Sequence, residues 1–437
     1  MRRLILKKFR IVDETSEFFG SLIIENGIIT NVIANDSPVN TDKFDMVIDG
    51  GAFGSSAVLM PSFIDLHAHF RDPGFPEKEI LESASLAAVA GGYTTVVCMA
   101  NTNPVTDTIE KARVLKTRSD TLGLVDLYPV LSLTKNMEGK ELSEIKAASK
   151  EDLLAAGILM FSEDGKDVAG DEVFLGAMTE AKRLGGPISC HCDFGGPEAQ
   201  AAKTAGLPRA EWSRIEENNA VRRAIELGKK TGGHIHIAHV STKEAAEFIR
   251  ETKKNLSANA DFSLTCEAAP HHIGATKEDA RRMGDESFGR VNPPLRTEAD
   301  RQAVIAAIYD KTIDAIATDH APHSEADKAA GAPGFSGLET AFSACFSNLA
   351  PGTSLQQLSA LMSANPARIL GLRDRGRIAA GLRADLVIVD IEAQQRVDPA
   401  RFKSRGKCSP FAGKELQGTV LMTLNAGKIV FTGDSNV

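Results

Sequence analysis

The chain has 437 residues, of which 43% are hydrophobic and 25% are charged, and its formal net charge at pH 7 is -8. These fractions are typical of a globular protein and exclude disordered and fibrous classes, and the negative charge leaves no basic surface for nucleic acid. No apolar run is long enough to span a membrane, and the basic N-terminal segment lacks the features of a signal peptide, so we expect a cytoplasmic protein.

The N-terminal region, residues 1–58, alternates short apolar segments with turns. These segments predict β-strands over residues 4–9, 21–24, 28–33 and 46–48. Asn26 and Gly27 stand between two of the strands, and this dipeptide is a strong signal for a tight hairpin. The region therefore predicts a small β module.

The central region, residues 59–369, repeats a pattern of apolar strand, polar loop and helix. The pattern predicts eight strands, over residues 63–66, 94–99, 125–131, 157–161, 187–190, 234–240, 263–268 and 314–318. Helical spacing lies between most of them, for example over residues 79–90, 172–184, 218–230, 243–254 and 298–309. The simplest architecture is a closed (β/α)8 TIM-like barrel, because closure leaves no sheet edge. An open doubly wound sheet is the alternative, but the chain lacks its glycine-rich dinucleotide turn.

The C-terminal region, residues 370–437, returns to short strands, over residues 384–390, 418–425 and 428–431. The last two strands are joined at Ala426-Gly427. We expect these strands to pair with those of the N-terminal region in a small β-sandwich subdomain formed from both chain ends. The predicted class is thus α/β, with a barrel and one β subdomain.

Histidines and acids stand where the predicted barrel strands end. His67 and His69 follow the first strand, and they project the same way because side chains alternate along an extended backbone. Other strand ends carry similar donors, which are Glu163, Asp164, His191, His239, Asp319 and His320. In a barrel the C-terminal strand ends meet at one rim, so we expect these side chains to share one site.

This mixture of nitrogen and oxygen donors suits Zn²⁺ or a similar divalent ion. The donors are too many for one tetrahedral ion with an open position, so two ions that share a bridging carboxylate fit better. Such an ion makes a bound water acidic enough to act as a nucleophile near neutral pH. The six cysteines lack the paired spacing of a structural zinc site. Cys190 and Cys192 flank a histidine on a predicted strand and so point away from it, and we expect these two in the core.

Six motifs, in this order, resemble the dihydroorotases of the amidohydrolase superfamily, and more narrowly their class I bacterial form. The motifs are His67-Ala-His69-Phe-Arg71-Asp-Pro-Gly74, Met99-Ala-Asn101-Thr-Asn-Pro104, His239-Val-Ser-Thr-Lys-Glu244, Ala269-Pro-His-His272, Val291-Asn292-Pro-Pro-Leu-Arg296 and Ala317-Thr-Asp319-His-Ala-Pro-His323. The resemblance implies a distorted (β/α)8 barrel with a small β domain. It also implies reversible hydrolysis of L-dihydroorotate to N-carbamoyl-L-aspartate, a step of de novo pyrimidine (UMP) biosynthesis.

The resemblance implies a set of six zinc ligands, which are His67, His69, Asp164, His191, His239 and Asp319. The first two histidines would hold one ion with Asp319, and the other two histidines would hold the second. Asp164 would be the bridge, where hydantoinases and other dihydroorotases use a carboxylated lysine. Glu163, expected to be a surface or second-shell acid, and a carboxylated Lys166 stay open as competitors, as does a single ion per chain.

The resemblance also implies the contacts to the substrate. The residues concerned are His69, Arg71, Asn101, Asn292, His323, Pro333 and Gly334. Arg71 would bind the substrate carboxylate with its planar guanidinium, and Asp319 would be the catalytic acid and base. Turn capping is the plainer alternative for the two asparagines. We expect His271 and His272 to serve packing or to support the ligands, and not to bind a metal themselves. The segment 325–336 is rich in Ala and Gly and predicts a mobile loop.

Two other functions stay open at this stage. A hydantoinase or allantoinase would share the metal ligands, but it usually has a lysine in place of Asp164 and lacks the His-Phe-Arg-Asp-Pro-Gly run. A non-catalytic partner of aspartate transcarbamoylase should have lost metal ligands, and this chain keeps all of them. Association with aspartate transcarbamoylase stays open for the enzyme itself, and we expect a homodimer because similar proteins are often dimers.

Overall fold

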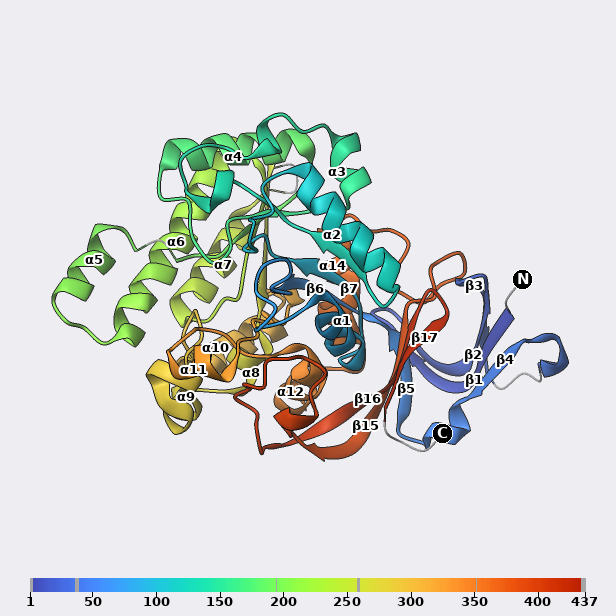
Figure 1. Ribbon diagram of the computed structural model, residues 1–437. Helices are drawn as coiled ribbons and strands as arrows, with labels where there is room; N and C mark the ends of the chain where they lie inside the picture. The colour runs from blue at the N-terminus through green and yellow to red at the C-terminus, as the bar shows by residue number, and fades with distance from the viewer. Residues whose placement is uncertain (1–2, 36–38, 194, 258–259, 351, 434–437) are drawn as a thin grey trace.

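A computed structural model describes residues 3–35, 39–193, 195–257, 260–350 and 352–433. It is a mixed α/β structure in which a set of parallel strands with helices lies beside a large sheet built from both ends of the chain (Figure 1). None of the described helices has both the length and the apolar character that crossing a membrane requires.

The large sheet confirms that the two chain ends come together. Its eight strands are β1 (Arg3–Val12), β2 (Glu17–Glu25), β3 (Ile28–Ala34), β4 (Met46–Asp49), β5 (Ala57–Pro61), β15 (Leu386–Arg396), β16 (Glu415–Asn425) and β17 (Lys428–Thr432). The order is β17-β16-β15-β5-β1-β2-β3, with β4 paired to β1, so the pairings form one continuous sheet. The predicted turns at Asn26-Gly27 and Ala426-Gly427 both have positive φ at both residues, as tight hairpin turns need.

The two chain ends are joined through β5 and β15, and the sequence pattern did not predict the first of these strands. β5 was not predicted, and it pairs antiparallel with β15 from Ala57 to Pro61. The predicted boundary between residues 58 and 59 therefore falls inside β5. Apolar side chains from both ends, including Leu59 and Leu386, form one fully buried cluster beneath this sheet.

The parallel strands form two sheets. The first contains β6 (Phe63–Ala68), β7 (Tyr93–Cys98) and β8 (Asp126–Pro129), and the second contains β9 (Leu131–Ser132), β10 (Phe161–Ser162), β11 (Ile188–Cys190), β12 (Gly233–Ile237), β13 (Phe262–Ala268) and β14 (Ala315–Ile316). Only Val130 separates β8 from β9, so one segment joins the two sheets. A parallel bridge between Ala68 and His320 links the segment after β14 to β6. This arrangement is consistent with a barrel.

Helices follow most of these strands. They are α1 (Leu81–Ala90), α2 (Ile109–Leu122), α3 (Lys150–Ala156), α4 (Asp171–Leu184), α5 (Gly196–Thr204), α6 (Arg209–Thr231), α7 (Lys243–Asn255), α8 (Pro270–Gly274), α9 (Lys277–Met283), α10 (Glu298–Tyr309), α11 (Glu325–Ala329), α12 (Ala341–Leu349), α13 (Leu355–Ser359) and α14 (Asn365–Ile369). The helix predicted over residues 218–230 begins nine residues earlier, at Arg209. With α5 it forms a helical pair that extends to the left in Figure 1.

The core and the cysteines agree with the sequence pattern. The largest cluster of buried apolar side chains lies between the parallel strands and the surrounding helices, and it includes Phe63, Phe161 and Ile237. All six cysteines are free and buried. Residues 325–336 were predicted to be a mobile loop, and this was wrong in part, because the segment contains helix α11 with a Ser324 capping box.

Candidate metal centre

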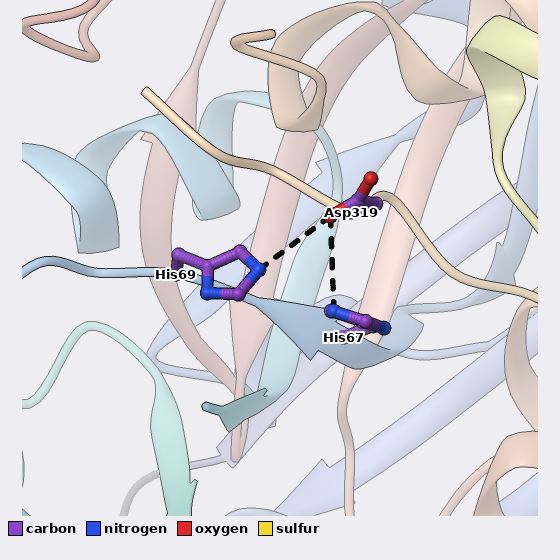
Figure 2. Close-up of side chains that lie close together, drawn as sticks. All are labelled: His67, His69 and Asp319. Carbon is purple, nitrogen blue, oxygen red and sulfur yellow. Dashed lines mark ion pairs between the residues drawn. The ribbon is translucent and has the colours of Figure 1, made fainter. Parts of the chain in front are cut away.

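The six predicted ligands meet at the C-terminal ends of five parallel strands. His67 is the penultimate residue of β6 and His69 directly follows that strand, while the others follow β10, β11, β12 and β14. Figure 2 shows His67 and His69 pointing at the same carboxylate oxygen, Asp319 Oδ1, at 3.7 Å and 3.5 Å from their Nε2 atoms. The prediction that distant segments bring these side chains to one place is therefore confirmed.

Asp164 lies at the middle of this group. Its Oδ2 atom lies 2.8 Å from His191 Nδ1, 3.3 Å from His67 Nε2 and 3.7 Å from His239 Nε2. Its Oδ1 atom lies 3.3 Å from His69 Nε2. Burial alone would raise the pKa of Asp164, but the charges of His191 and His67 hold it well below its usual value. Asp164 thus contacts four imidazoles from three other strand ends.

The donor atoms fit a divalent cation. His67 Nε2 and Asp164 Oδ2 are buried and face each other, yet neither has a hydrogen-bond partner in the described parts of the chain. Buried polar atoms are normally paired, so these two are candidates for metal coordination. The donor atoms of His67, His69 and Asp319 lie within 4.8 Å of one another, as do those of His67, Asp164 and His239.

One detail of the second group differs from the expected ligand set. His191, which we predicted beside His239, is absent from the second compact group, and His67 takes its place. His191 Nδ1 lies 2.8 Å from His239 Nε2, so the two rings share a hydrogen bond and face the same carboxylate oxygen. Burial lowers the pKa of His191, but Asp164 raises it to about 9.

Glu267, which the sequence analysis missed, orients His67 from behind. His67 Nδ1 lies 3.1 Å from Glu267 Oε1, and His236 Nε2 lies 2.9 Å from Oε2 of the same carboxylate. Burial would raise the pKa of Glu267, but His236 and His67 lower it to about 2. An ionised acceptor on Nδ1 keeps the proton there and leaves Nε2 free to bind a metal. The only hint in the sequence was an acid inside an apolar strand.

Glu163 and Lys166 take positions that favour Asp164 as the bridge. Glu163 is buried and accepts hydrogen bonds at 3.0 Å from the backbone N–H groups of Leu133 and Thr134, as well as from the Thr134 hydroxyl. It is therefore a supporting acid and lies in the interior, not at the surface. Lys166 is exposed, and its ammonium donates to the Met137 carbonyl at 3.0 Å.

Beside the candidate ligands lies a cavity of about 170 Å³. All seven residues expected to contact substrate line it, and they are His69, Arg71, Asn101, Asn292, His323, Pro333 and Gly334. Asn101 Oδ1 lies 2.8 Å from His69 Nδ1, so this asparagine orients a candidate ligand and does not only cap a turn. A larger hollow of about 390 Å³ lies against β15 to β17 and contains none of these side chains.

One end of this cavity is electropositive. Arg71 Nη2 lies 3.2 Å from His323 Nε2, which in turn lies 2.9 Å from the Pro333 carbonyl oxygen. Burial lowers the pKa of His323, and the charges of Arg71, Lys78 and Lys328 add to this, giving a pKa of about 3. The imidazole is therefore neutral, and the arginine supplies the positive charge.

Asn292, another residue of the cavity wall, is held in place by a second arginine. Its Nδ2 atom lies 3.2 Å from Asp193 Oδ2 and 3.4 Å from His191 Nε2. Its Oδ1 accepts from Arg209 Nη2 at 3.2 Å, at the start of α6. The sequence analysis did not find Arg209, because the helix was predicted to begin later.

Several site residues have strained backbone. Arg71, Cys192, His239 and Asp319 all have φ between 34° and 57°. Such a conformation costs about 1–3 kcal/mol for a residue other than glycine and is typical of functional sites.

The adjacent histidines of the Ala269-Pro-His-His272 motif differ in their surroundings. His271 Nε2 lies 3.8 Å from Asp319 Oδ2, and burial lowers the pKa of His271 to about 4. His272 Nε2 lies 3.2 Å from the Pro293 carbonyl oxygen. His272 thus packs as expected, whereas His271 is a neutral neighbour of the candidate catalytic acid.

Known proteins share both the sequence and the fold of this chain. Residues 58–430 match the amidohydrolase family. The dihydroorotase of Clostridium botulinum (strain Eklund 17B / Type B) is 40% identical, over 98% of this chain and 99% of that protein. The dihydroorotase of Geobacillus sp. (strain WCH70) is 38% identical, over 94% of each chain. Among solved structures, the L-hydantoinase (dihydropyrimidinase) from Arthrobacter aurescens superposes with a TM-score of 0.86 at 26% identity, covering 100% of this chain and 98% of that one. The chain therefore belongs to the amidohydrolase family and, within it, to the dihydroorotases.

Proposed function

We propose that this chain is a metal-dependent dihydroorotase, which hydrolyses the cyclic amide of L-dihydroorotate reversibly to N-carbamoyl-L-aspartate in pyrimidine synthesis. The observation that carries the proposal is one cavity that combines two kinds of lining. Arg71, where a carboxylate would bind, lines it together with Asp164 and Asp319 of the candidate metal centre. The dihydroorotase relatives, which match nearly the whole chain, support the same activity.

We further propose that two zinc ions bind in this site. His67, His69 and Asp319 would hold one ion, His191 and His239 would hold the other, and Asp164 would bridge them. When bound, such ions make a water molecule acidic near neutral pH and polarise the carbonyl group that is attacked. The paired acids support this, because two ionised carboxylates beside each other need a cation to offset their repulsion.

Arg71 orients the substrate in this proposal. Its guanidinium would pair with the substrate carboxylate, and Asn101 and Asn292 would bind the polar groups of the ring. One His323 nitrogen cannot accept from Arg71 and donate to the Pro333 carbonyl at once, and the two contacts are 3.2 Å and 2.9 Å. A substrate carboxylate that takes over Arg71 would leave His323 free to donate to Pro333.

Asp319 is the proton carrier in this proposal. Burial raises its pKa, but the surrounding histidines, His69 first, lower it well below the usual value, so the side chain is an ionised base at neutral pH. Asp319 takes the proton of the attacking water as its oxygen bonds to the ring carbonyl carbon. The C–N bond of the ring then breaks, and Asp319 returns the proton to the leaving nitrogen. Ring closure of N-carbamoyl-L-aspartate follows the same steps in reverse.

Turnover of three cyclic amides tests the proposal. Dihydrouracil matches dihydroorotate but lacks the carboxylate, and hydantoin is the ring that the structural neighbours are named for. We expect kcat/KM for dihydroorotate to exceed that for dihydrouracil by about 100-fold or more, as the loss of a charged bidentate contact predicts. Equal values for the two rings, or a preference for hydantoin, would assign the chain to a different cyclic amidohydrolase activity.

The remaining assignments complete the proposal. Residues 59–369 form the closed (β/α)8 barrel, apart from the end of β5, which pairs in the large sheet. That sheet, from residues 1–58 and 370–437 with the end of β5, forms the small β-sandwich subdomain. The enzyme is a homodimer in the cytoplasm, and six free, buried thiols suit a reducing compartment. Light scattering after size exclusion, alone and with aspartate transcarbamoylase, measures the dimer and any association. A mass of one chain would exclude the dimer.

A further inference from the structure

A buried lysine fastens the wall of the cavity. Lys328, in α11, is 1% exposed. Its ammonium donates three hydrogen bonds, to the carbonyl oxygens of Arg290 at 2.7 Å, Ala332 at 2.9 Å and Gly334 at 3.0 Å. All three protons of the ammonium are therefore used on backbone acceptors.

The three acceptors belong to two different cavity-lining segments. Arg290 precedes Val291 and Asn292, whereas Ala332 and Gly334 flank Pro333. The Gly334 N–H also donates to the Arg290 carbonyl oxygen at 3.0 Å, so this oxygen accepts from both Gly334 and the Lys328 ammonium. A Cβ at Gly334 would lie 2.4 Å from the Ala321 carbonyl oxygen, so this part of the wall is packed closely against Ala321 and has no space for a side chain.

Lys328 is unusual because it forms no ion pair with any acid among the residues that the structure describes. Burial, with the nearby charges of Arg290 and Arg209, lowers the pKa of Lys328 to about 8. A buried cation without a counter-ion is costly, and an apolar side chain of the same length would fill the space without that cost. Its three bonds hold two segments at a fixed separation, which an apolar side chain cannot do.

We propose that Lys328 is a positioning residue for substrate binding, which clamps the Val291–Asn292 and Pro333–Gly334 walls together around the carboxylate end of the cavity. The assignment rests on the proposed dihydroorotase activity. Lys328 contacts no candidate metal ligand, so the clamp acts on substrate binding and leaves the metal centre intact. His323 connects the clamp to the substrate, because it lies 2.9 Å from the Pro333 carbonyl oxygen.

The test compares Lys328→Met with a matched control, Lys78→Met. Lys78 also places a positive charge near His323, but it is more exposed and its nearest acid is Asp327 at 4.0 Å. For Lys328→Met we expect KM for dihydroorotate to rise by about tenfold, with kcat within about threefold and metal per chain unchanged. Hydrogen exchange at the Gly334 amide should also become faster. Lys78→Met should change neither KM nor this exchange rate.

Several outcomes would overturn the proposal. One is an unchanged KM together with an unchanged exchange rate of the Gly334 amide in Lys328→Met. Another is an equal rise of KM in Lys78→Met, which would indicate that the loss of a positive charge, and not of the clamp, raises KM. A parallel loss of kcat, metal content and melting temperature would indicate a purely structural role. If Lys328→Met does not fold, Lys328→Gln replaces it in the test, because its amide keeps two N–H donors. The proposal then requires a KM that is higher than that of wild type but by less than tenfold. If wild type fails to turn over dihydroorotate, the proposed function fails, and Gly334 exchange still decides whether the clamp exists.

Discussion

Replacing Glu267 by Gln should weaken metal binding without disturbing the fold. The carboxylate accepts from His67 Nδ1 at 3.1 Å and from His236 Nε2 at 2.9 Å, and all three side chains are buried. An amide has the same shape but only one acceptor oxygen, so one histidine loses its acceptor. A hydrogen bond to a charged group contributes about 1.5–3 kcal/mol. His236 can change tautomer and accept a hydrogen bond from the new NH₂ group. His67 then keeps the amide oxygen as a neutral acceptor, and the lost stabilisation is near the lower end of this energy range.

The expected change is a loss of about 10- to 100-fold in metal affinity, the usual range for a residue that orients a ligand histidine. Competition with a chelator of known affinity measures it, and the melting temperature of the metal-free protein reports the fold. Thr265→Val is the matched control, because Thr265 Oγ1 bonds His236 Nδ1 at 2.8 Å and leaves Glu267 and His67 untouched. Unchanged metal affinity in Glu267→Gln would refute the orienting role. An equal loss in Thr265→Val would refute it too, because general repacking would then be the cause.

Three further predictions concern the other end of the site and the ions themselves. Arg71→Met should raise KM for dihydroorotate by about 10- to 100-fold and leave dihydrouracil turnover unchanged. Steady-state kinetics on both substrates measures this, and an equal fall of kcat/KM for the two would contradict it. Asp319→Asn should lower kcat by about 10²–10⁴-fold, with a far-ultraviolet circular dichroism spectrum like that of wild type. A loss of kcat smaller than about 100-fold would contradict the role of Asp319 as proton carrier. Chelation should lower the melting temperature and added Zn²⁺ should restore it, because an ion that binds only the folded state stabilises that state. An unchanged melting curve after chelation would count against a bound ion.

The sequence was informative where chemistry follows a periodic pattern. Alternating strands and helices predicted where the strands end, and the position of His67 and His69 two residues apart predicted that both would face one centre. The strand end predicted that Glu163 and Asp164 lie at the centre, and the family resemblance selected Asp164, which the structure places among four histidines. These predictions succeeded because the parallel sheet brings its strand ends to one rim whatever the loops between them do.

The sequence was silent where position depends on contacts between distant backbones. Lys328 was hidden in an Ala- and Gly-rich segment, because its partners are carbonyl oxygens that every residue carries. Glu163 was expected at the surface or beside the centre, and only the folded neighbourhood of Leu133 and Thr134 decides between them. The left-handed backbone at His239 and Asp319 left no trace in the residue types, because neither is glycine.

The most direct test of the metal centre is anomalous diffraction at the zinc edge, from crystals of the active enzyme loaded with Zn²⁺. We predict density for two ions within about 2.0–2.2 Å of the ligand atoms, with a carboxylate oxygen of Asp164 in contact with each. A fully active crystal with no anomalous density among these six side chains would contradict it.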